Sequence, residues 1–390
     1  MRALLQRGVP TRAYFSPIHL QPAHDAPRSA PAVGAQAHNG CRTTAAEEPA
    51  RVSVVVAAKD EEANIEACLR SVLAQDHPRF ELLVVNDRST DATGTILQRL
   101  SEEFGGRMRV LTVERLPEGW GGQNHALRQG VSATSGEWLC FTDADCRWDS
   151  PRTLAVACAE TLAHRADLFS LLPRMEAPTI WEKLYVPVCC LVFLMRLRLG
   201  DVNRADRPAA YANGAFMMAR RAAYEALGGH ERVRGEVNDD VALARHAKAA
   251  GYRVRVAGNS GLVRTRMYGS PRQAWNGWTR NFLGTLQSGR ALAAALAATL
   301  ALFVLPWAGF AACAALALRA GPSWNGAALA WGAALLATHA GMWVVYATFG
   351  CPAAASLLYL AGAIFVAGVA ASALGRAVRK TRTVWHGARY

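Results

Sequence analysis

Short apolar runs alternate with amphipathic stretches from residue 51 onward. VSVVVA at 52–57 and FELLVV at 80–85 are runs of the length and composition of strands buried in a parallel sheet. Residues 61–73, between them, place their apolar side chains on one helical face. Two further strands and a second helix are predicted at 109–113, 137–142 and 122–133. Strands separated by helices of this length predict a doubly wound α/β sheet.

Acidic clusters follow three of these predicted strands. KDEE occupies 59–62, NDRSTD occupies 86–91 and DADC occupies 143–146. In open α/β sheets, ligands bind at the carboxyl ends of the strands. The three clusters therefore predict a ligand site at this edge of the sheet.

The C-terminal part of the chain is apolar and nearly free of charge. Between Arg290 and Arg319 lie 28 residues without Asp, Glu, Lys or Arg, and between Arg319 and Arg376 lie 56. A membrane span needs ~20 apolar residues. The sequence therefore predicts three transmembrane helices, near 292–318, 327–348 and 353–375. Their many Ala and Gly residues suit close helix packing in lipid.

Three spans conflict with the charge of the tail. They would carry the basic tail 376–390 to the face opposite the first domain, against the positive-inside tendency. Either one apolar stretch is re-entrant or another segment enters the membrane. Residues 181–199 are too short and too flanked by charge to span, so they predict an interfacial helix or, alternatively, a core helix.

The net charge of +13 is concentrated after Asp240, the last acid in the chain. A group of basic residues precedes the apolar region: Arg245, Lys248, Arg253, Arg255, Arg264, Arg266, Arg272, Arg280 and Arg290. Such a cluster beside membrane segments is attracted to anionic lipid. Nucleic-acid binding is the competing explanation, but no nucleic-acid motif is found in the sequence, so we expect a membrane and no nucleic acid as partner.

The sequence divides into four parts. Residues 1–50 lack periodicity and a signal-peptide core, so we expect a disordered segment and no secretion. The catalytic-type domain is expected at 51–290, the membrane region at 291–375 and the basic tail at 376–390. The nine cysteines show no CxxC spacing, which indicates small buried residues in a reducing compartment.

Asp143 and Asp145 are the strongest candidates for chemistry. Two carboxylates one residue apart after a strand offer oxygen ligands for Mg²⁺ or Mn²⁺, although acidic loops of this length are also common solvated turns. Asp87 is placed to accept hydrogen bonds from a base or ribose, or else to cap the next helix. Glu62 has the same two alternatives, a nucleotide pocket or a helix N-terminus.

Asp239 and Asp240 precede a predicted amphipathic helix. They are candidates for helix capping, or one of them for a general base, because a neighbouring like charge and burial raise a carboxyl pKa. Further along, Arg280 is a candidate for neutralising a departing diphosphate, and Trp275 and Trp278 for contacting a sugar or acceptor. The alternative for these aromatic residues is a juxtamembrane belt.

These motifs, in order, resemble a known family. VSVVVAAKDEE, VVNDRSTD, LPEGWGGQNHALRQG, LCFTDADC, YANGAFMMARRAAYEALGGHE, GEVNDDVALA and RTRMYGSPRQAWNGWTRN resemble the family 2 glycosyltransferases. Within that family the sequence is most similar to bacterial membrane enzymes of carotenoid and hopanoid glycosylation. The resemblance covers about residues 51–290 and implies the GT-A fold, a doubly wound mixed sheet.

The resemblance also implies roles for individual residues. Ala57, Glu62 and Asp87 fall where the family binds the nucleotide. Asp143 and Asp145 fall on its metal and diphosphate motif, and Asp240 on its catalytic base. The segment from Trp275 to Arg280 takes the place of a QxxRW-like element. The sequence departs from the family at Ala57, where Pro is usual, at Asn86, where Asp is usual, and at Gln123, where Lys is common.

Together these observations predict an inverting glycosyltransferase at the cytoplasmic membrane face. The expected donor is a nucleotide-diphospho-sugar, in particular a UDP-sugar, the acceptor a lipid or isoprenoid hydroxyl, and the cofactor Mn²⁺ or Mg²⁺. Two alternatives remain: a processive polysaccharide synthase and a non-catalytic membrane scaffold that retains the fold.

Overall fold

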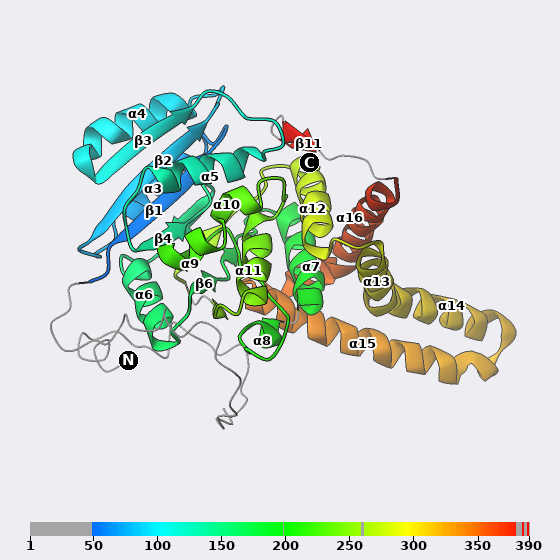
Figure 1. The fold of residues 1–390 in the computed structure, drawn as a ribbon. Coiled ribbons are helices and arrows are strands. Elements are labelled where there is room, and N and C mark those ends of the chain that lie inside the picture. Colours follow the sequence, from blue (N-terminus) through cyan, green and yellow to red (C-terminus); the bar gives the residue numbers. More distant parts are fainter. Residues whose placement is uncertain (1–48, 198, 259–260, 380–383, 386–387, 390) are drawn as a thin grey trace.

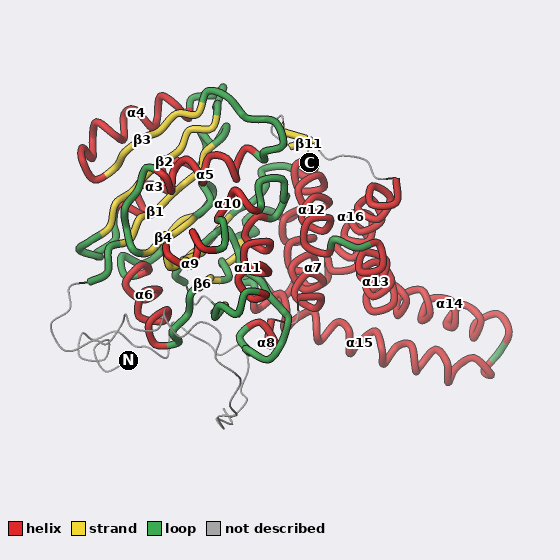
Figure 2. Tube along the Cα trace, viewed as in Figure 1, coloured by secondary structure: helices red, strands yellow, loops and turns green. Residues whose placement is uncertain are grey.

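The computed structural model describes residues 49–379 except 198, 259 and 260, together with 384, 385, 388 and 389 (Figure 1). The segment 1–48, which includes almost all of the predicted disordered region, lies outside the described residues, as do several positions of the basic tail. A sheet with helices on both faces forms the first part of the molecule, and helices alone form most of the remainder (Figure 2).

A seven-stranded sheet has the order β3-β2-β1-β4-β8-β6-β9. Its strands are β1 (Val52–Ala58), β2 (Phe80–Asp87), β3 (Met108–Val113), β4 (Trp138–Phe141), β6 (Leu168–Leu171), β8 (Met217–Arg220) and β9 (Val254–Ala257). β8 runs antiparallel to both β4 and β6, whereas the other neighbours are parallel. The sheet is therefore mixed, and the expected doubly wound mixed sheet is confirmed.

Two apolar clusters cover the two faces of this sheet, because successive side chains of a strand point to opposite faces. Val54 and Val56 of β1 pack with α3 (Ile65–Leu73), α4 (Thr93–Phe104) and α6 (Thr153–Ala163). Val55 packs on the other side with α5 (Gly122–Ser132) and α11 (Asp239–Ala249). Two short helices, α8 (Leu199–Val202) and α9 (Arg221–Ala226), also contribute to this cluster, and α10 (Gly229–Arg232) packs against α5.

A second, three-stranded sheet lies beside the end of β4. It has the order β5-β10-β7, formed by β5 (Cys146–Trp148), β10 (Val263–Thr265) and β7 (Arg174–Met175). β5 begins directly after the DAD sequence, so this small sheet holds the acidic loop from its C-terminal side. A short pair, β11 (Val384–Trp385) and β12 (Ala388–Arg389), follows near the C-terminus.

The three predicted apolar segments are long helices. α13 (Gly289–Thr299), a π-helical turn at Leu300–Val304 and α14 (Leu305–Ala320) form the first; α15 (Asn325–Thr348) and α16 (Tyr359–Arg379) form the others, with short 3₁₀ turns at Pro322–Trp324 and Ala353–Leu358. All three are long and apolar enough to cross a membrane. α14 and α15 form an antiparallel hairpin that projects from the rest of the molecule (Figure 1).

A third apolar cluster joins the catalytic-type domain to these helices. α7 (Ile180–Leu197) and α12 (Pro271–Leu286) pack against α16. Val188 and Cys189 of α7, Trp278 of α12 and Val366 of α16 are all buried in it. α7 corresponds to the segment predicted as an interfacial or core helix, and its contacts in the described residues are those of a helix packed between the domain and α16.

Candidate active site

Asp87 lies at the carboxyl end of β2 and is 2% exposed. Its two carboxylate oxygens accept hydrogen bonds from Arg88, over 2.8 Å from Nε and 2.9 Å from Nη2. Gly122, the first residue of α5, lies so close that a Cβ there would be 2.5 Å from Asp87 Oδ2. Asp87 is therefore packed against the N-terminus of α5, where the helix dipole favours negative charge.

The next residue of α5 reaches the DAD loop. Gln123 Nε2 donates a hydrogen bond to Asp143 Oδ1 over 3.3 Å. The first turn of α5 therefore contacts both Asp87 at the end of β2 and Asp143 just after β4, although these residues are far apart in the sequence.

Gly214 connects Asp143 to Asp240. Its backbone N–H donates to Asp240 Oδ2 over 2.7 Å, and a Cβ on it would lie 3.2 Å from both carboxylate oxygens of Asp143. Asp240 stands in the first turn of α11, where its Oδ1 also accepts a hydrogen bond from its neighbour's N–H, that of Val241, over 2.7 Å. Contacts thus run from Asp87 through α5 to Asp143 and on to Asp240.

Asp145 completes the acidic loop. Cys146 Sγ donates to Asp145 Oδ1 over 3.4 Å, and potential ligand atoms of Asp143, Asp145 and Cys146 all lie within 4.8 Å of one another. Cys68 Sγ donates to the backbone oxygen of Asp143 over 3.6 Å and holds the loop from α3. Burial raises the pKa of Asp145, and the positive charge of Arg280 is one of the smaller effects that oppose this rise.

Burial and mutual repulsion raise the pKa of the clustered carboxyl groups. Burial first, and then the charges of Asp145 and Asp240, raise the pKa of Asp143 well above its usual value. Burial and Asp239 raise the pKa of Asp240 to about 7, and burial raises that of Glu61 to about 7, with a further contribution from Asp145. Such a concentration of acids is typical of a functional site.

The donor set fits a hard divalent cation. Two carboxylates with close oxygens are ligands that Mg²⁺ and Mn²⁺ prefer, and a cation would relieve the repulsion that raises these pKa values. The buried Cys146 thiol lies in the same group, but its pKa is raised by burial and by Asp145, so it remains a protonated hydrogen-bond donor.

Comparison with known proteins identifies the family. Residues 53–228 match the family model of Glycosyl transferase family 2, and residues 169–371, more than half of the chain, match that of Glycosyl transferase family group 2. The chain belongs to the family 2 glycosyltransferases. The mixed sheet with flanking helices is the GT-A fold that the sequence motifs implied.

Two curated relatives are similar to parts of this glycosyltransferase. It is 26% identical over 234 residues to the 4,4'-diaponeurosporenoate glycosyltransferase of Staphylococcus aureus, across 59% of this chain and 60% of that protein. It is 34% identical over 108 residues to the probable glycosyltransferase YdaM of Bacillus subtilis, across 27% of this chain and 24% of that protein. The chain thus spans less than two thirds of either relative's length.

A solved structure is similar over more of the chain. The mannosyltransferase PcManGT from Pyrobaculum calidifontis, in complex with GDP-Man and Mn²⁺, aligns with a TM-score of 0.49 and 22% sequence identity. The alignment covers 85% of this glycosyltransferase and 88% of that protein.

Asp239 has a different environment from Asp240. Its Oδ2 lies 3.1 Å from His230 Nε2, and the other ring nitrogen of His230 lies 2.7 Å from the hydroxyl of Tyr224. Asp239 and Tyr224 are nearly buried and His230 is fully buried. The sequence analysis missed His230, and the available signal was its place in GGHE, shortly before the acidic pair.

Two predicted nucleotide-site residues lie outside the carboxylate cluster. Glu62 Oε2 accepts a hydrogen bond from the N–H of Ala92, the residue that caps α4, over 2.9 Å. Ala57 is half-buried near the end of β1, opposite Val85 of β2. Glu61, which sequence analysis did not single out, is the acid of that loop that interacts electrostatically with Asp145.

The two tryptophans of α12 pack in the apolar cluster. Trp278 is 4% exposed and lies against Phe193 and Phe282, with ring centroids 6.0 and 6.3 Å away. Trp275 lies against Phe365 of α16, with ring centroids 5.3 Å apart. Arg280 of the same helix acts on Asp145, so α12 connects the apolar cluster to the acidic loop.

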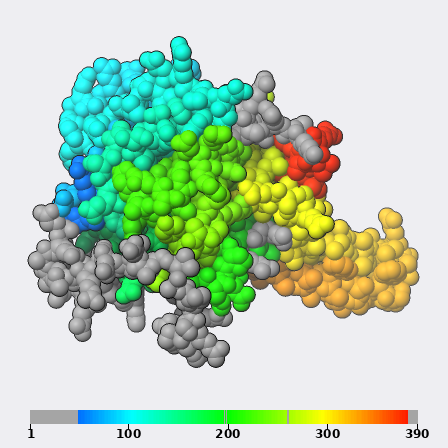
Figure 3. All heavy atoms as spheres, viewed as in Figure 1, coloured from blue at the N-terminus to red at the C-terminus, as the bar shows by residue number. Residues whose placement is uncertain are grey.

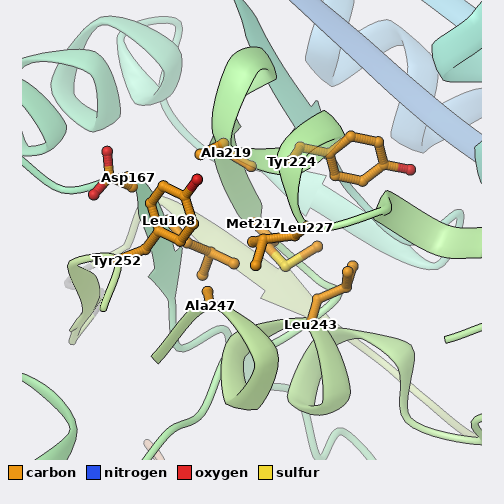
Figure 4. A pocket seen from close by; sticks show the side chains of 10 residues that line it. Asp167, Leu168, Met217, Ala219, Tyr224, Leu227, Leu243, Ala247 and Tyr252 are labelled. Carbon is orange, nitrogen blue, oxygen red and sulfur yellow. The ribbon is translucent and has the colours of Figure 1, made fainter. Parts of the chain in front are cut away.

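A separate small cavity lies between α11 and strands β6 and β8 of the large sheet (Figure 4). Its volume is about 10 Å³, and mostly apolar side chains such as Leu168, Met217 and Leu243 line it. A space of this size holds at most one water, and an apolar lining favours a dry void. The cavity is a packing defect between sheet and helix, apart from the acidic site.

Proposed function

We propose that this family 2 enzyme transfers a sugar from a nucleotide-diphospho-sugar to a hydroxyl of a lipid or isoprenoid acceptor at the cytoplasmic face of the membrane, with inversion. One observation carries the proposal: Asp143 and Asp240, nearly a hundred positions apart, both contact Gly214. The acid suited to metal and diphosphate and the acid suited to base catalysis are therefore adjacent in one site.

Asp240 acts as the general base. It accepts the acceptor hydroxyl proton while that oxygen forms a bond to the anomeric carbon and the bond from this carbon to the diphosphate breaks on the opposite side. The nucleoside diphosphate leaves with the bonding electrons. A base whose pKa is raised to about 7 is well matched to proton transfer near neutral pH.

Asp143 and Asp145 would hold Mn²⁺ or Mg²⁺, which supplies positive charge for the diphosphate. Asp143 is oriented by Gln123 and Asp145 by Cys146. Burial raises the pKa of Asp145, and the positive charge of Arg280 opposes this rise, so Arg280 adds a fixed positive charge near the acidic loop.

The nucleotide is assigned to the ends of β1 and β2. Asp87, held by Arg88 and packed on α5, would accept hydrogen bonds from the base or ribose. Ala57 and the loop of Glu62 form the neighbouring wall, and the Glu62 carboxylate fixes the start of α4. A UDP-sugar remains the predicted donor.

The acceptor is assigned to the membrane side because the acidic site adjoins an apolar anchor. α12 carries Arg280 toward Asp145 and packs Trp275 and Trp278 against α7 and α16. In this arrangement the tryptophans position α12, and through it Arg280, beside the acceptor entrance. The name of the Staphylococcus aureus relative, 4,4'-diaponeurosporenoate glycosyltransferase, supports a lipid-like acceptor.

The test is transfer from radiolabelled UDP- and GDP-sugars into lipid extracts by membranes that contain the wild-type chain, Asp240→Asn or Asp206→Asn. Asp206 is an exposed surface acid and serves as the matched control. One labelled lipid product from wild type and Asp206→Asn, and none from Asp240→Asn, supports the proposal. A ladder of long products indicates the processive synthase instead, and an absence of both transfer and donor hydrolysis indicates the scaffold.

A further inference from the structure

The α14–α15 hairpin and α16 have different surroundings. Exposed apolar side chains cover the hairpin, among them Leu318, Leu329 and Leu336, which are 90%, 75% and 72% exposed. Of the most apolar window, 28% is buried in the segment that contains α14 and 6% in the segment that contains α15, against 39% in the segment that contains α16. Figure 3 shows the hairpin as a yellow-orange projection that extends to the right beyond the rest of the molecule.

α16 lies along the catalytic domain. Gly362 approaches the backbone of α7 so closely that a Cβ would collide with the oxygen of Leu184. Phe365 packs on Tyr185 of α7 and on Trp275 of α12, with ring centroids 4.9 and 5.3 Å apart. α16 therefore contacts both domain helices over successive turns.

The helix beside α16 is unsuited to the bilayer interior. Arg272, Gln273 and Asn276 of α12 are exposed, and Arg280 of the same helix interacts electrostatically with Asp145 of the acidic site. An arginine at the centre of a membrane helix is strongly unfavourable. α16 packs directly against α12, so the two helices must lie at the same depth relative to the bilayer. The polar side chains of α12 place that depth at the membrane surface.

The hairpin has the length and the turn residue of a two-helix membrane insertion. The π-turn and α14 together extend from Leu300 to Ala320, and at 1.5 Å per residue this is about 32 Å, close to the ~30 Å hydrocarbon thickness. Trp324 lies at its turn, and tryptophan there is typical of a membrane interface.

We infer that, among the described residues, the chain crosses the bilayer twice, through the α14–α15 hairpin, and that α13 and α16 lie at the cytoplasmic surface beside the catalytic domain. This inference rests on the membrane location in the proposed function. It places Arg290, Arg376 and Arg379 on the side of the catalytic domain and leaves Arg319 as the charged residue near the far turn. The basic tail then obeys the positive-inside tendency, which three crossings would violate.

The experiment is cysteine labelling of the full chain in a bacterial inner membrane. Three variants each add one exposed cysteine: Glu102→Cys in α4, Ser323→Cys at the hairpin turn and Arg379→Cys at the end of α16. A membrane-impermeant maleimide is applied to spheroplasts and to inside-out vesicles, and the wild-type chain gives the background from native cysteines. We expect Glu102→Cys and Arg379→Cys to label only in inside-out vesicles, and Ser323→Cys only in spheroplasts.

Other outcomes overturn the inference. Arg379→Cys labelled in spheroplasts shows that α16 crosses the membrane, and Ser323→Cys labelled in inside-out vesicles, or protected in both preparations, shows that the hairpin does not. Release of the wild-type chain from membranes by alkaline carbonate is a separate result, because it contradicts the membrane location of the proposed function itself.

Discussion

Asp240 and Gly214 are joined by a 2.7 Å hydrogen bond from the glycine N–H to the carboxylate, and Asp143 approaches the same glycine from another element. The bond fixes one oxygen of Asp240, and the bare Cα of Gly214 allows Asp143 to come near. The spacing of the two acids therefore depends on a residue without a side chain.

Gly214→Ala should lower kcat/KM by about tenfold. The new Cβ would lie 3.2 Å from both oxygens of Asp143, so the carboxylate must move by a few tenths of an ångström, and a misplacement of 1 Å can cost about 100-fold. Steady-state transfer kinetics measure the effect. Gly106→Ala, where a Cβ meets nothing within 4 Å, is the control and should behave as wild type. Equal rates for all three chains would contradict the proposed importance of this spacing.

Asp240→Asn should reduce kcat by about 10²–10⁴-fold, the usual contribution of a general base. Donor affinity, measured by titration with a non-transferable nucleotide-sugar analogue, should change little. In the wild-type enzyme kcat should rise with pH through about 7, because the carboxyl must lose its proton to act as a base. A pH-independent kcat between pH 5.5 and 8, or a strong loss of donor binding in the variant, would remove Asp240 from this role.

The metal-free enzyme should lose thermal stability as pH rises from about 5.5 to 8. Asp143, Asp145, Asp240 and Glu61 have raised pKa values in the folded chain, so folding favours their protonated forms, and this stability is lost as pH rises through the folded pKa. Asp143→Asn should flatten the slope of Tm against pH. Mn²⁺ should raise Tm more at pH 8 than at pH 5.5, and the opposite order would argue against a cation at these acids.

His230→Phe should destabilise the enzyme by about 1–3 kcal/mol, the typical cost of leaving a buried polar partner unsatisfied. The substitution removes the contacts of His230 with Asp239 and Tyr224. The Asp239 carboxylate then stays nearly buried but has lost its imidazole partner. Thermal unfolding in detergent measures the loss. Tyr224→Phe removes only the hydroxyl and should cost less, so a larger effect from Tyr224→Phe would show that Asp239 does not depend on the imidazole.

Gly362→Leu should loosen α16 from the domain and cost roughly 1–3 kcal/mol, as overpacking does. A side chain at this position collides with the Leu184 backbone of α7. Gly375→Leu, on the same helix at a position where a Cβ would meet nothing within 4 Å, is the matched control. The melting temperature of the solubilised protein distinguishes them, and identical values would mean that α16 does not depend on this close approach.

Sequence periodicity predicted the parallel half of the sheet well, because its strands and helices alternate with strong local patterns. The predicted 52–57 and 80–85 became β1 (Val52–Ala58) and β2 (Phe80–Asp87). The other half was not predicted. β8 (Met217–Arg220) is only four residues long and pairs antiparallel with two strands distant in the sequence, so its position is decided by tertiary contacts rather than by periodicity.

The acidic residues of the site were named from motifs, but their connections were not. A motif gives the residue type at a strand end, whereas the position of Gly214 between Asp143 and Asp240 depends on the return of the chain after α7. The same limit applies to Trp275 and Trp278. A tryptophan side chain suits sugar stacking and helix packing equally, and only the positions of α7 and α16 show that these two are packed against apolar neighbours.

The burial of α7 against α16 has a practical result for anyone who wishes to purify the enzyme without detergent. Val188, Cys189 and Trp278 are covered in part by helices that follow residue 288 in the sequence. A chain that ends at residue 288 would expose these apolar surfaces to water. It should therefore precipitate, although its sheet is complete. Redesigning the outer surfaces of α7 and α12 with polar side chains is therefore the first requirement for a water-soluble version.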